Sequence, residues 1–87
     1  MTLTQTTVVE RVQTGLRIER TLLKVLKGVA ELKDVSLGDL VEGIVLHAFE
    51  GASPFTDETL AQIAQLREVY GLTLRAAESH LLTEEPA

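Results

Sequence analysis

Few side chains in this sequence could carry out catalysis or hold a metal ion. His47 and His80 are far apart, and neither has neighbouring acids or histidines at the spacing of a metal site. The chain has no cysteine, which excludes disulfides and thiolate ligands. Ser36 has no histidine base within a recognisable motif, so we expect it to cap a helix. We therefore predict that the protein is not an enzyme and uses no metal or cofactor.

A second group of polar side chains is better suited to binding a partner. Within residues 8–18 the even positions are mostly apolar and the odd positions mostly polar or basic, which is typical of a half-buried strand. Arg11, Gln13 and Arg17 fall on the polar side, with Gly15 between them. Taken alone, this spacing fits solvated residues on an exposed edge as well as it fits residues that contact a partner.

The charges of the chain are unevenly distributed. The net charge is −5, which by itself argues against a nucleic acid partner, because phosphates are neutralised by lysine and arginine. Residues 1–33, however, carry six basic and three acidic side chains, a net of +3, whereas residues 34–87 carry two basic and ten acidic ones, a net of −8. Such a chain could present two different faces to two partners.

Composition favours a small helical domain that associates with a second copy of itself. With 45% hydrophobic but only 3% aromatic residues, the core must consist of Leu, Val, Ile and Ala. A chain of 87 residues buries a smaller fraction of its surface than a larger one. The apolar stretches are too short to span a membrane, and the N-terminus lacks the pattern of a signal peptide, so we expect a cytoplasmic protein.

The spacing of hydrophobic residues becomes helical at Glu19. The first predicted helix ends near Asp34, the second begins after Ser36 as its N-cap, and the third begins after Thr56. Thr73 is a further possible N-cap, for a short fourth helix. No second run alternates like residues 8–18, so the natural partner of that strand is the same strand in another copy.

These elements divide the chain into four parts. We predict a flexible N-terminal arm over residues 1–7 and a dimerisation domain over residues 8–51, for which the family resemblance described next also implies DNA binding. A C-terminal helical extension is expected over residues 52–82, with a disordered tail over residues 83–87.

The order strand, helix, tight turn, helix resembles the ribbon-helix-helix family of dimeric repressors. The resemblance is carried by "LRIERTLLKVLKGVAELKDVSLGDLVEGIVLHAF", residues 16–49, roughly half of the chain, and mainly by its hydrophobic spacing. It implies a mainly α fold in which one N-terminal strand pairs with a second chain, followed by two core helices, with one or two C-terminal helices added. In this family the paired strands enter the major groove of DNA.

The resemblance also implies roles for individual residues. Base contacts are expected from the outward side of the strand, at Arg11, Gln13, Gly15 and Arg17, since arginine suits guanine and glutamine suits adenine. Phosphate contacts are expected at the start of the second helix and from the basic side of the first, at Ser36, Leu37, Gly38 and Lys24. The dimer core is expected to contain Leu16, Ile18, Leu22, Leu26, Leu40, Val41, Ile44, Val45 and Phe49.

We accordingly expect a homodimeric, sequence-specific DNA-binding protein that regulates transcription as a repressor, with double-stranded DNA as its partner. The alternative is an acidic dimerisation or protein-interaction module, antitoxin-like or an adaptor, with little or no DNA binding. In that case residues 53–87 would bind a protein partner. A third possibility is that these C-terminal residues only cover the dimer core.

Overall fold

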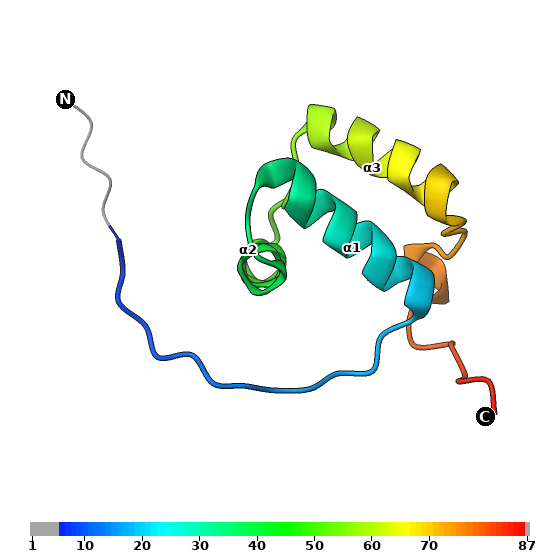
Figure 1. Ribbon diagram of the computed structural model, residues 1–87, viewed down its shortest axis with the longest axis horizontal. Coiled ribbons are helices and arrows are strands. Elements are labelled where there is room, and N and C mark those ends of the chain that lie inside the picture. Colours follow the sequence, from blue (N-terminus) through cyan, green and yellow to red (C-terminus); the bar gives the residue numbers. More distant parts are fainter. Residues whose placement is uncertain (1–5, 87) are drawn as a thin grey trace.

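The computed structural model describes residues 6–86 and consists mainly of three α-helices. These are α1 (Arg20–Lys33), α2 (Leu37–Phe49) and α3 (Asp57–Tyr70), followed by a single 3₁₀ turn, η1 (Ala76–Glu78). Helix α1 is central because it contacts both α2 and α3. Figure 1 shows α3 lying beside α1 in the opposite direction, while α2 crosses on the other side of α1.

The prediction of a ribbon-helix-helix fold is wrong for this structure, since residues 6–86 contain no strand. Residues 6–19, called the arm below, have no regular secondary structure and run along the open side of the helices (Figure 1). A strand is stabilised by hydrogen bonds to a neighbouring strand. The backbone of residues 6–18 makes no such bond within the described chain, so the alternating pattern is not sufficient to form one. A separate prediction, that residues 1–7 are flexible, concerns mostly residues outside the described part of the chain.

The change from alternating to helical hydrophobic spacing at Glu19 is explained by helix capping. The Glu19 carboxylate accepts hydrogen bonds from the backbone N–H of Leu22 at 2.9 Å and from the Thr21 hydroxyl at 2.6 Å. The Thr21 hydroxyl, and after it the backbone N–H of Leu22, lower the pKa of Glu19. The helix ends at Asp34, which takes a left-handed conformation with φ of 56°. Glu19 thus begins α1 without a turn before it.

The predicted starts of the next two helices are confirmed. Ser36 Oγ accepts the N–H of Asp39 at 3.0 Å, and Thr56 Oγ1 accepts the N–H of Thr59 at 3.2 Å. Gly71 ends α3 with φ of 72°, a conformation that glycine adopts without strain. The predicted fourth helix is reduced to η1, which begins after Arg75 instead of Thr73.

The hydrophobic core of one chain is small. Its buried hydrophobic residues come from α1, α2 and the residue after Gly71: Val25, Val29, Ala30, Leu40 and Leu72. Helix α3 approaches α1 closely at Gly28, where a Cβ would lie only 3.1 Å from the Leu66 side chain. This contact within one chain explains a glycine in the middle of α1.

A buried polar contact joins the far end of the same two helices. Thr59 is buried, and its hydroxyl accepts a hydrogen bond from Lys33 Nζ at 3.0 Å and lies 3.1 Å from Thr56 Oγ1. Burial of a hydroxyl is tolerated when its hydrogen bonds are made. Lys33 therefore ties the end of α1 to the start of α3.

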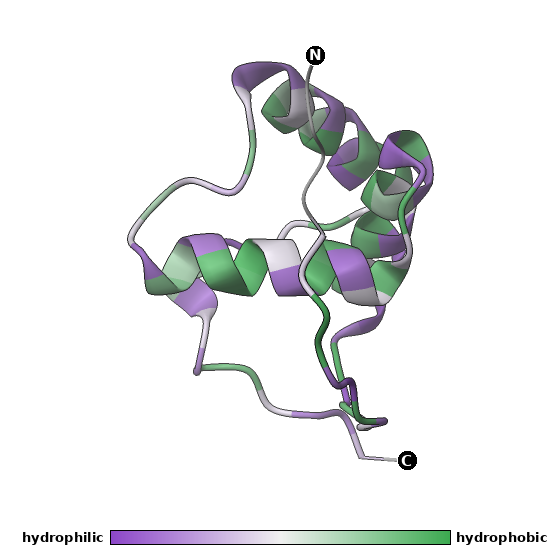
Figure 2. Ribbon diagram, turned by 90° about the vertical axis from the view of Figure 1, so that its left-hand side faces the viewer, coloured by the Kyte–Doolittle hydropathy of each residue, from purple (hydrophilic) through white to green (hydrophobic). Residues whose placement is uncertain are grey.

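Much of the hydrophobic surface stays exposed in a single chain. Val12 and Leu16 of the arm are 80% and 74% exposed, and Phe49 at the end of α2 is 82% exposed. Figure 2 shows hydrophobic residues along much of α2. None of the helices within residues 6–86 has the length and apolar character needed to cross a membrane.

Candidate nucleic-acid interface

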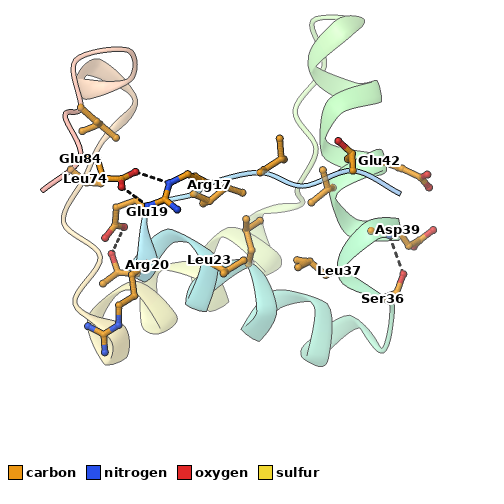
Figure 3. Close-up of a pocket in the computed structure, with 18 of the residues that line it drawn as sticks. Arg17, Glu19, Arg20, Leu23, Ser36, Leu37, Asp39, Glu42, Leu74 and Glu84 are labelled. Carbon is orange, nitrogen blue, oxygen red and sulfur yellow. Dashed lines mark hydrogen bonds and ion pairs between the residues drawn. The ribbon is translucent and has the colours of Figure 1, made fainter. Parts of the chain in front are cut away.

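The arm, the N-terminal ends of α1 and α2, and the C-terminal segment (residues 79–86) enclose a wide, open hollow. Several predicted DNA contacts line it together: Arg11, Arg17, Ser36, Leu37 and Gly38. Figure 3 shows side chains from the arm, the two helices and the C-terminal segment around it. The structure therefore brings together residues that come from three separate parts of the sequence.

Arg11 in the arm forms an ion pair with Glu42 on α2. Arg11 Nε donates to Glu42 Oε2 and Arg11 Nη2 donates to Glu42 Oε1, both at 2.8 Å. Both side chains remain accessible, at 64% and 45% exposure. The hydrogen bonds from Arg11 lower the pKa of Glu42, so this carboxylate stays ionised over a wider pH range than an isolated glutamate.

Arg17 forms an equivalent pair with Glu84 in the C-terminal segment, as Figure 3 shows. Arg17 Nε donates to Glu84 Oε1 at 2.9 Å, and Arg17 Nη2 donates to Glu84 Oε2. The arginine side chain is 82% exposed. The hydrogen bonds from Arg17 lower the pKa of Glu84.

Sequence reasoning did not identify Glu42 and Glu84 as partners of these arginines. The available signal was the contrast between a basic N-terminal third and an acidic remainder. This contrast favours attraction between the two regions, but it cannot select one of ten acids.

The start of α2 lies on the same hollow. The first amides of a helix have no partner within the helix, and its dipole favours an anion there. Ser36 Oγ already binds the N–H of Asp39, and the Asp39 side chain adds a negative charge to the first turn. A phosphate contact by Leu37 and Gly38 stays a prediction.

Other predicted contacts lie elsewhere. Gln13 and Gly15 belong to the arm, but they do not line the hollow. Lys24 Nζ lies 5.8 Å from the centre of the Tyr70 ring, on the side of α1 that faces α3. A cation over an aromatic ring is weakly stabilised. The structure thus places Lys24 with α3, apart from the residues that line the hollow.

The predicted dimer-core residues differ in how far they are buried within a single chain. Leu40 is buried, and Leu26 and Ile44 pack against the buried core. Val41 is half-buried and lines the hollow. The others are exposed to solvent: Leu16, Ile18, Leu22, Val45 and Phe49.

Comparisons with known proteins identify no relative. No protein-family model, no curated protein and no solved structure matches the chain. Within residues 6–86, no group of three or more acidic or histidine side chains is placed to bind a metal ion.

Proposed function

We propose that the protein is a homodimeric DNA-binding protein that regulates transcription, and that the arm carries the contacts to DNA. The observation that carries this proposal is the exposure of Arg11 and Arg17 on a segment without secondary structure beside the start of α2. A guanidinium group can bind the edge of guanine or a phosphate through two parallel hydrogen bonds. The arm thus presents the two arginines to a groove on an extended segment, whose own net charge is zero because Glu10 and Glu19 balance them.

The overall charge of −5 does not prevent this role, because DNA responds to the local charge. Residues 6–33 contain all three lysines and three of the five arginines. The acidic residues are concentrated after residue 33. Four of these later acids, Asp39, Glu42, Glu84 and Glu85, line the same hollow as Arg11 and Arg17, so binding of DNA there depends on the arginines leaving their carboxylate partners.

Self-association is supported by the contrast between the small core and the exposed hydrophobic residues. Among residues 6–86 of one chain, five hydrophobic residues are buried, whereas sixteen large ones are exposed. Burial of apolar surface contributes about 25 cal/mol per Å². A second copy that covers the exposed residues of α2 and the arm would therefore add substantially to the stability of so small a chain.

The test is a titration of random and genomic duplex DNA at several salt concentrations, with the native mass measured alongside. We expect the affinity to fall steeply with salt, and Arg17→Ala to weaken binding at least about fivefold while the dimer persists. Lys27→Ala is the charge-matched control, because Lys27 is exposed on α1 and does not line the hollow. Absence of binding to any duplex at low salt would contradict the proposal.

A protein-interaction role for residues 53–87 is the second candidate. It is favoured by exposed hydrophobic residues among the acids of this region: Leu60, Val69, Leu81 and Leu82. Chains that form a dimer but bind no DNA, even at low salt, would favour this candidate over the first.

A further inference from the structure

The two arginines that we place on DNA are both held by carboxylates of the same chain. Each pair uses the Nε and Nη2 donors of the guanidinium and both oxygens of the carboxylate. This is the two-point geometry in which arginine binds carboxylate and phosphate most strongly. Glu42 and Glu84 therefore occupy one edge of each guanidinium and set a negative charge beside it, so an acceptor on DNA has to displace the carboxylate or bind next to it.

These pairs are also the main polar link between the arm and the helices. Within the described chain, every hydrogen bond made by residues 6–18 comes from the side chain of Arg11 or Arg17. Within residues 6–86 the structure contains no other ion pair. The position of the arm over the hollow thus depends mainly on these two exposed ion pairs.

The two acids are separated from the arm in sequence and belong to different elements. Glu42 lies on α2, 31 positions from Arg11, and Glu84 lies in the C-terminal segment, 67 positions from Arg17. The arginines are therefore engaged only in a folded chain whose C-terminal segment lies against the arm. The nearby Glu85 lines the hollow too, but it forms no ion pair in the described structure.

We infer that Glu42 and Glu84 form an autoinhibitory clamp, which holds the DNA-binding arginines and must open before the arm can engage DNA. This inference rests on the proposed DNA-binding function. Because both pairs are exposed to solvent, the clamp is weak and DNA can compete with it. Because the cost of opening is the same for every duplex, the clamp reduces binding to random DNA and to a favourable site by the same factor.

The experiment compares Glu42→Gln, Glu84→Gln and the double variant with the wild-type chain. Glu50→Gln and Glu85→Gln are the matched controls, because they remove the same charge from the end of α2 and from the C-terminal segment without breaking an ion pair. We expect each clamp variant to bind random duplex DNA about two- to fivefold more tightly than its control, as befits an exposed pair. Circular dichroism and native mass should be unchanged.

A second measurement needs no DNA. The Nε–H resonance of Arg17 in the free protein should shift and exchange faster with water in Glu84→Gln, and stay unchanged in Glu85→Gln. The clamp is refuted if the clamp variants bind DNA no more tightly than their controls. If no chain binds DNA, the proposed function fails and the clamp with it. A wild type that binds DNA, with equal binding by variants and controls, overturns the clamp alone.

Discussion

The helices of residues 20–70 and the arm before them differ in what holds them in place. Each helix begins at a side chain that accepts a backbone N–H, namely Glu19, Ser36 or Thr56, and two of the helices pack against α1. Residues 6–18 of the arm have neither caps nor backbone partners within the described chain, and they are attached through two arginines. A periodic pattern therefore becomes regular structure only where the chain itself supplies the hydrogen-bond partners.

The largest expected effect on stability comes from removing a hydrophobic side chain from the helical core. Leu40→Ala on α2 should lower the free energy of unfolding by about 2–5 kcal/mol, because Leu40 is buried among α1 and α2 residues. Leu46→Ala on the same helix is the control, since Leu46 is 63% exposed. Chemical denaturation measures both. Equal losses would show that the buried core of one chain does not dominate stability.

The exposed end of α2 offers a way to test whether a second copy covers it. If the proposed dimer covers this end, Phe49→Glu should dissociate it while the helices stay intact, because a charge would be placed in an apolar interface. Sedimentation equilibrium measures the mass, and Glu50→Gln controls for a change at the same helix end. An unchanged dimer would exclude Phe49 from the interface.

Replacing either of two glycines within helices by alanine should have a smaller effect on stability. Gly43→Ala should stabilise the chain by about 1 kcal/mol, because a Cβ there meets no atom within 4 Å in one chain. Gly28→Ala should gain less, since its Cβ would press on Leu66. Thermal unfolding compares them. A loss of stability in Gly43→Ala would instead indicate that a second copy packs closely against α2.

The smallest effect is expected where the arm meets α1. Hydrogen bonds to Thr21 and Leu22 lower the pKa of Glu19, so its capping stabilises the folded chain above the ordinary pKa of glutamate and is lost as pH falls through the lower folded value. Glu19→Gln should therefore lower the melting temperature slightly at pH 7 and have less effect at pH 3. An equal effect at both pH values would contradict a role for the ionised carboxylate.

Sequence reasoning succeeded for the helices and failed for the ribbon. The caps at Ser36 and Thr56 were predicted correctly because each signal acts within about four residues. The prediction of a strand was wrong, because alternating apolar and polar residues indicate which side of a segment is buried, but they do not supply a second strand to pair with it. For the candidate site, the spacing places Arg11 and Arg17 on one side of the segment, and their contact with DNA stays a prediction; it does not indicate their partners Glu42 and Glu84.

The sequence by itself determined where the three helices begin and end, and that the basic residues precede the acidic ones. Only the tertiary structure decided that α3 packs on Gly28, that Leu72 joins the core, and that Glu84 reaches Arg17. Capping is local, whereas residues 31 and 67 positions apart meet only after the helices have packed. The arm's arginines thus acquired their partners from the fold.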